Sequence, residues 1–159
     1  MFILRDMETS DIKAVVEIIS AHQKIDGRMA RKYYKEYFLR MKRAKTDREK
    51  NIIAITEEGE IAGIIGYTPD KYDLPGILWL SWFYVKQKHR GRGLGSMLLN
   101  YIIDEARNLG VRKLYIDSSS DESYASAARL YRRFNFKGEG RLIDYYGSGE
   151  DAILWGFVL

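Results

Sequence analysis

The chain has 159 residues, a length that suits one domain with a single packed core. Its composition, 46% apolar and 30% charged residues with a net charge of +4, is typical of a soluble globular protein and argues against a disordered chain. No apolar run is long enough for a membrane span, and the first residues lack the features of a secretory signal, so we expect a cytoplasmic protein with no membrane partner. The absence of cysteine excludes thiol catalysis.

Three elements are predicted before residue 50. Residues 2–5 form a short strand, and apolar spacing predicts a helix over residues 12–19. A second amphipathic helix is expected over residues 33–41. The stretch 28–50 carries ten Lys or Arg against three acidic residues, a local net charge of +7. This excess predicts a solvated helix face or an attractor for an anionic ligand, an acidic protein or nucleic acid. We do not expect nucleic acid, because the aromatic residues here share a stripe typical of core.

The middle of the chain predicts a hairpin followed by a buried strand. Residues 51–56 and 60–67 are rich in β-formers and are joined through a Glu-Glu-Gly turn. Residues 77–85 read Ile-Leu-Trp-Leu-Ser-Trp-Phe-Tyr-Val, which is apolar on both alternating faces. Such a strand belongs in the middle of a sheet.

The remaining elements alternate between helix and strand. Apolar periodicity predicts a helix over residues 94–109, a strand over 111–117, a helix near 127–134 and final strands near 136–143 and 152–158. No repeat or linker interrupts the chain, so we expect a single α+β domain over residues 1–159. Exposed final strands could pair two chains into a homodimer.

A glycine-rich, basic loop joins the buried strand to the next helix and reads Arg90-Gly91-Arg92-Gly93-Leu94-Gly95. The free N–H groups and the positive dipole end of a helix N-terminus form an anion site, and glycines let the backbone approach the anion closely. Basic side chains at positions 86, 88, 90 and 92 add charge for a polyphosphate. The loop therefore predicts a pyrophosphate site.

Two other kinds of phosphate-binding loop fit this segment less well. The nucleotide-hydrolase pattern G-x-x-x-x-G-K-[ST] is absent. The dinucleotide pattern G-x-G-x-x-G is met by Gly91 and Gly93, but Ser96 stands at the third glycine. The chain also lacks the length and the repeated βα units of a dinucleotide-binding domain.

A third pattern, Q/R-x-x-G-x-G/A, is met by Arg90, Gly93 and Gly95. With this loop in place, the sequence resembles the GNAT superfamily of acyl-CoA-dependent N-acetyltransferases, most closely over residues 78–136. The resemblance implies an α/β/α sandwich with a mixed, mostly antiparallel sheet of about seven strands and about four helices. It also implies acetyl-CoA as cosubstrate and no metal ion. The expected cofactor-binding residues are Phe83, Tyr84 and Val85 beside the pantetheine arm, and Arg90, Gly91, Arg92, Gly93, Leu94, Gly95 and Ser96 around the pyrophosphate.

A second motif, Ala127-x-x-Leu130-Tyr131-x-x-Phe134-Asn135-Phe136, resembles the family's A-x-x-L-Y-x-x-x-G-F, with asparagine in place of the glycine. The family tends to place an asparagine seven residues before the tyrosine, where this chain has Tyr124. Ser120 or Ser123 could replace that contact to the cofactor arm. The resemblance implies that Tyr131 is the general acid beside the thioester sulfur, and a core position for Tyr131 is compatible with this role.

Asp117 ends the strand over residues 111–117 and matches the position at which some relatives place a glutamate, so it is a candidate general base. A strand-end acid serves equally well as a cap for the next turn. Tyr145 and Tyr146 lie in a segment similar to one that lines the acceptor groove in relatives acetylating protein N-terminal amines. Ordinary hairpin aromatics are the alternative.

We therefore expect an N-acetyltransferase that moves an acetyl group from acetyl-CoA directly to a primary amine of a peptide or small molecule. The alternative is a catalytically silent acyl-CoA-binding regulatory module of the same fold, and the presence of Tyr131 favours the enzyme. The two histidines are too few for a usual zinc site, and no G-x-S-x-G nucleophile elbow occurs.

Overall fold

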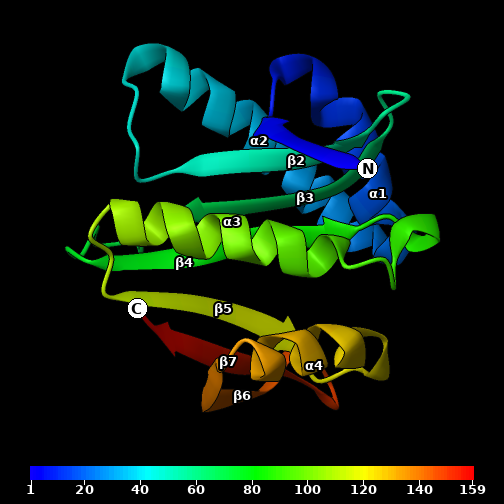
Figure 1. The fold of residues 1–159 in the computed structure, drawn as a ribbon. Coiled ribbons are helices and arrows are strands. Elements are labelled where there is room, and N and C mark those ends of the chain that lie inside the picture. Colours follow the sequence, from blue (N-terminus) through cyan, green and yellow to red (C-terminus); the bar gives the residue numbers. More distant parts are fainter. The chain divides into compact units, whose positions relative to one another are not determined.

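The computed structural model describes residues 1–159, and its seven strands form a mixed sheet in the order β1-β2-β3-β4-β5-β7-β6 (Figure 1). The strands are β1 (Phe2–Asp6), β2 (Lys50–Thr56), β3 (Ile61–Thr68), β4 (Ile77–Val85), β5 (Lys113–Ser119), β6 (Lys137–Gly147) and β7 (Glu150–Val158). The α-helices are α1 (Ile12–His22), α2 (Lys24–Arg43), α3 (Leu94–Asn108) and α4 (Ala125–Arg133). Seven strands and four α-helices confirm the predicted α+β class. None of the helices has the combination of length and apolarity that crossing a membrane requires.

Residue contacts divide the chain into two compact units. The first contains Met1–Thr68 and Ser81–Ile102, and the second contains Pro69–Leu80 and Ile103–Leu159. Both β4 and α3 therefore contribute residues to each unit.

The first unit is built on an antiparallel meander of β1, β2 and β3. Leu4 pairs with Ala54, and Ile52 pairs with Ile65 across the next ladder. Apolar side chains that recur at helical spacing on α1 and α2 pack with apolar strand residues in one core cluster. Its buried members are Met7, Val15, Val16, Ile19, Ala30, Tyr34, Ile53 and Ile64. The predicted strand, helix and hairpin of this region are confirmed.

Helix α2 is longer than its sequence predicts, because it begins at Lys24 and not near residue 33. Only Gln23, in an extended conformation with a φ of −148°, separates it from α1. At Gly27 the two helices touch: a Cβ on this residue would lie 1.8 Å from the hydroxyl of Ser20. The lack of a side chain at Gly27 thus allows the close approach that the first turns of α2 require.

Strand β4 is the fourth of the seven strands, as its apolar faces predict. It pairs in parallel with β5 at Ile77, Leu78 and Trp79. Farther along, Trp82 has a φ of +45°, in the left-handed region that a bulky side chain rarely occupies. Such strained positions cluster at functional sites, so the outlier indicates that the adjoining residues of β4 belong to a candidate functional site.

The second unit contains the antiparallel ladders β5–β7 and β7–β6. Its hairpin differs from prediction: β6 continues to Gly147 and β7 begins at Glu150, so Tyr145 and Tyr146 lie on a strand. The register shifts between Leu142 and Gly147, where Asp144 has a φ of +54°. The ladder is interrupted at this irregularity and resumes where Gly147 pairs with Glu150.

Candidate active site

The loop before α3 provides the first part of the candidate site. The initial N–H groups of a helix have no intrahelical partner. Here the backbone N–H groups of five consecutive residues, Gly91 to Gly95, donate no hydrogen bond within the protein. Gly91 and Gly93 have φ values of +72° and +79°, and a Cβ on either would meet no atom within 4 Å. These N–H groups have no partner, they lie beside open space, and they stand at the positive end of the helix dipole. They therefore fit an anion such as pyrophosphate.

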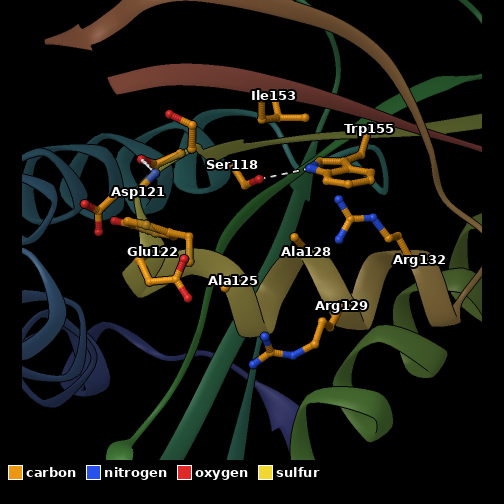
Figure 2. Close-up of a pocket in the computed structure, with 12 residues that line it drawn as sticks. Ser118, Asp121, Glu122, Ala125, Ala128, Arg129, Arg132, Ile153 and Trp155 are labelled. Atoms are coloured by element: carbon orange, nitrogen blue, oxygen red, sulfur yellow. Dashed lines mark hydrogen bonds between the residues drawn. The ribbon is translucent and has the colours of Figure 1, made fainter. Parts of the chain in front are cut away.

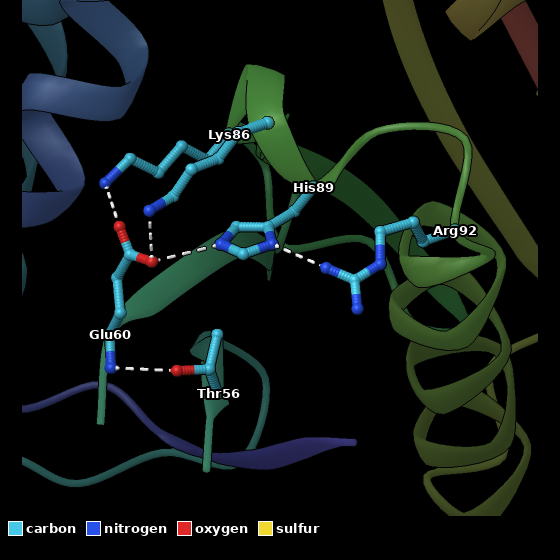
Figure 3. A network of polar contacts seen from close by, with 6 residues as sticks. Thr56, Glu60, Lys86, His89 and Arg92 are labelled. Carbon is cyan, nitrogen blue, oxygen red and sulfur yellow. Dashed lines mark hydrogen bonds and ion pairs between the residues drawn. The ribbon is translucent and has the colours of Figure 1, made fainter. Parts of the chain in front are cut away.

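A network of ion pairs holds this loop to the β2–β3 turn (Figure 3). The carboxylate of Glu60 accepts hydrogen bonds from the ammonium groups of Lys86 and Lys88, the latter at 2.7 Å. It also contacts Nε2 of His89 at 3.1 Å. Nδ1 of His89 lies 3.2 Å from the guanidinium of Arg92, which can only donate. Nδ1 is therefore the acceptor, and Nε2 carries the proton that His89 donates to Glu60.

The cations predicted to surround a polyphosphate all contact groups of the protein itself. Besides its contact with His89, the Arg92 guanidinium stacks over the ring of Phe2, with 5.4 Å between its central carbon and the ring centre. Nε of Arg90 donates to the carbonyl of Val85 at 3.0 Å. These side chains thus fix the conformation of the loop, and the backbone amides are left as the donors without partners.

The Glu60 network predicts a pH dependence of stability. Hydrogen bonds from Lys86, Lys88 and His89 lower the pKa of Glu60 from 4.5 to about 2. Because the folded-state pKa is depressed, the stabilisation is complete above about pH 4.5 and is lost as the pH falls toward 2. Glu60→Gln should therefore destabilise the protein at pH 6 and flatten the fall in stability between pH 4.5 and pH 2. Urea unfolding of both proteins over this range tests it, and parallel curves would contradict it.

The last residues of β4 were predicted to lie beside the cofactor arm, and the structure adds a partner for one of them. The hydroxyl of Tyr84 donates to the carboxylate of Asp26, in the first turn of α2, at 2.6 Å. The ring of His22 meets Tyr84 edge-on, with 5.7 Å between ring centres. The sequence gives no signal for this contact, since Asp26 and Tyr84 are 58 residues apart.

In the second unit, Tyr131 projects from α4 into an aromatic cluster. Its side chain is 3% exposed, and its ring centre lies 5.8 Å from that of Phe136 and 5.9 Å from that of Trp155. Burial raises the pKa of Tyr131 well above its usual value of 10, and the negative charge of Asp117 adds to the rise. Tyr131 is therefore a core residue whose hydroxyl remains protonated at physiological pH.

Two of the predicted site residues meet directly, because the hydroxyl of Tyr146 donates to the carboxylate of Asp117. Asp117 is exposed and lies within β5, two residues before its end. The cap of the following turn is instead Asp121, which accepts a hydrogen bond from the N–H of Ser123 at 2.9 Å. Tyr145 contacts Tyr146 edge-on and is 62% exposed, so both rings are accessible on the hairpin.

A cavity of about 300 Å³ lies in the second unit beside α4 (Figure 2). Its lining includes Ser118, whose hydroxyl accepts a hydrogen bond from the indole of Trp155 at 2.9 Å. The guanidinium of Arg132 extends toward the same indole, 5.1 Å from a ring centre. Tyr124 and Ser120, considered above for the missing asparagine, also line the cavity. Sequence patterns did not identify Trp155 and Arg132, because neither belongs to a motif quoted above.

Known proteins resemble this chain over most of its length. The model of the Acetyltransferase (GNAT) family matches residues 16–136. A spermine/spermidine N(1)-acetyltransferase of Bacillus subtilis is 31% identical over 101 residues, a match that covers 60% of this chain and 64% of the relative.

Solved structures agree with this match. A protein of Desulfovibrio desulfuricans described as a GNAT-family acetyltransferase superposes with a TM-score of 0.86 at 23% identity, covering 99% of each chain. A ribosomal-protein-alanine N-acetyltransferase of Brucella melitensis has a TM-score of 0.79 at 23% identity, with the same coverage. At such identities the likeness shows the fold alone, and the family follows from the sequence match. This chain belongs to the GNAT family of acetyltransferases.

Proposed function

We propose that this protein is an N-acetyltransferase that transfers an acetyl group from acetyl-CoA directly to a primary amine. The observation that carries the proposal is the set of unbonded backbone N–H groups from Gly91 to Gly95 at the head of α3. These donors would bind the pyrophosphate of the cosubstrate, and the glycine conformations leave room for its approach. The last residues of β4 would pair with the pantetheine arm, as the family resemblance implies.

The chemistry requires an acceptor amine without its proton and a stabilised leaving group. As the nitrogen forms its bond to the acetyl carbon, the carbon–sulfur bond breaks and the nitrogen releases a proton. Asp117, exposed on β5, would accept that proton directly or through water. The hydroxyl of Tyr131 would donate to the departing sulfur. Because the pKa of Tyr131 is raised well above that of a thiol, near 8.5, its role is to stabilise the thiolate by a hydrogen bond.

The side chains around Asp117 favour a cationic acceptor. The carboxylate of Glu150 accepts a hydrogen bond from Ser119 at 2.5 Å, and Asp117 accepts one from Tyr146. The carboxylate of Asp117 on β5, and that of Glu150 on β7, which contacts β5 at Ser119, would attract an ammonium group, and the exposed Tyr145 would add an aromatic face for it. The polyamine acetyltransferase of Bacillus subtilis supports an amine acceptor, although that match covers only 64% of the relative.

Turnover of acetyl-CoA with a panel of amines tests the proposal. Polyamines, lysine-containing peptides and peptides with a free N-terminus are incubated with the protein and acetyl-CoA, and mass spectrometry detects a gain of one acetyl group. At least one class should be acetylated with a turnover above the background reaction. Binding of acetyl-CoA without product from any amine would support the regulatory module instead, and failure to bind acetyl-CoA would exclude both.

A further inference from the structure

One side of α2 concentrates positive charge. With 100° of rotation per residue, an arc of about 120° contains seven cations and no acidic residue. The seven are Lys24, Arg28, Arg31, Lys32, Lys35, Lys42 and Arg43. All are exposed, and only Lys32 is paired, with Glu36 at 4.0 Å. Along the helix axis the arc extends over about 29 Å.

This distribution differs from that of a neutralised surface. Two other arginines of the first unit are paired with acids, Arg5 with Asp11 at 2.8 Å and Arg40 with Glu49 at 2.6 Å. On the arc, like charges lie three and four residues apart, an arrangement that destabilises a helix slightly. The arc therefore presents a positive potential that only the pair of Lys32 with Glu36 offsets in part.

Large apolar side chains accompany the cations. Ile25 and Leu39 lie on the same arc, and their side chains are 52% and 55% exposed. Met29, 58% exposed, lies about 40° beyond the edge of the arc. Arginine and methionine side chains are enriched in protein interfaces. The aromatic residues that could stack on bases are instead in the core, since Tyr34 and Tyr37 are buried. This composition favours a protein partner over nucleic acid.

We propose that this arc of α2, from Lys24 to Arg43, is a docking surface for an acidic protein segment that also carries aliphatic side chains. Carboxylates of the partner would pair with the unpartnered cations, and its aliphatic groups would cover Ile25 and Leu39. The surface belongs to the first unit and is independent of the proposed catalytic chemistry.

A labelled peptide of four Glu-Glu-Leu-Glu repeats serves as the probe, with fluorescence anisotropy as the readout at about 50 mM salt. The peptide should bind, and Arg28→Gln combined with Lys35→Gln and Lys42→Gln should weaken binding about tenfold, since each exposed ion pair contributes modestly. Binding should also weaken as salt rises to about 200 mM, because the Debye length shortens.

A matched variant controls for net charge. Lys13→Gln combined with Lys71→Gln and Lys137→Gln removes the same charge from exposed sites outside α2 and should change the affinity less than about twofold. Both triple variants should retain the thermal unfolding transition of the parent and its binding of acetyl-CoA, so that a loss of fold or of cofactor binding is recognised separately.

The apolar contribution distinguishes the partner class. Ile25→Ser with Leu39→Ser leaves every cation in place and should weaken binding of the Glu-Leu peptide, while an oligonucleotide of equal charge should bind less tightly than the peptide. If the oligonucleotide binds as tightly and is insensitive to this variant, the surface is one for nucleic acid and the proposal is wrong. If no probe binds at about 50 mM salt, the arc is a solvated face.

Discussion

Tyr131→Phe is expected to lower kcat about 100-fold while leaving the KM for acetyl-CoA within about twofold. The substitution keeps the ring that packs against Phe136 and Trp155 and removes only the hydroxyl proposed to stabilise the leaving thiolate. Loss of a positioned proton donor typically costs two orders of magnitude or more in rate. Steady-state kinetics and pre-steady-state release of coenzyme A measure the effect on the chemical step.

The pH profile provides a second test of this role. Because the pKa of Tyr131 is raised by burial, the side chain should stay protonated through the range in which the enzyme is stable. The rate of the parent should therefore not fall at moderately alkaline pH through ionisation of Tyr131. Asp117→Asn, in contrast, should make kcat/KM rise more steeply as the pH increases in the alkaline range. The reason is that the amine must then lose its proton to solvent.

Tyr34→Phe is the matched control for this substitution. Tyr34 is fully buried in the first unit, and its hydroxyl has no hydrogen-bond partner, so its removal should affect neither rate nor fold appreciably. If both phenylalanine variants retain full turnover, Tyr131 is a packing residue only. If Tyr131→Phe is inactive but also loses the cooperative unfolding transition of the parent, activity should be compared at a temperature where both proteins are folded.

Apolar periodicity predicted the elements whose buried faces are evident from their own residues. Strand β4 was predicted over its full length because both of its faces are apolar, and α3 ends one residue before its predicted end. The start of α2 was not predicted, because its first turns depend on the contact between Gly27 and Ser20, which is tertiary. The β6–β7 hairpin was predicted too short, since side-chain contacts hold it: Asp151 accepts from the N–H of Asp144 at 2.8 Å.

In the candidate site, too, local features were predicted and tertiary contacts were not. The spacing of Gly91 and Gly93 predicted a loop with unbonded donors, which the structure has, because glycine conformation and helix termini are local properties. The partners of the loop's cations were not predicted. Glu60 is 26 residues from Lys86 in the sequence, and the folded β2–β3 turn brings the two side chains into contact. A sequence pattern can identify which groups are able to bind a phosphate. The folded structure determines which of those groups already contact other parts of the protein.

Gly93→Val should raise the dissociation constant for acetyl-CoA about 100-fold with a much smaller effect on kcat at saturation. Gly93 has a φ of +79°, which a β-branched residue adopts only with strain of about 1–3 kcal/mol. The new side chain would meet no protein atom, because the space around a Cβ here is open. It would instead occupy the approach to the unbonded N–H groups, so that two or more hydrogen bonds to the pyrophosphate are lost.

The same substitution at Gly110 separates strain from lost binding. Gly110 follows the other end of α3, has a φ of +69°, and likewise has no atom within 4 Å of its Cβ position. Both valine variants should therefore lose similar stability, measured by thermal unfolding, but only Gly93→Val should weaken acetyl-CoA binding in calorimetry. Equal affinity in the two variants would mean that the pyrophosphate is bound elsewhere, because a valine within reach of an occupied anion site cannot leave its affinity unchanged.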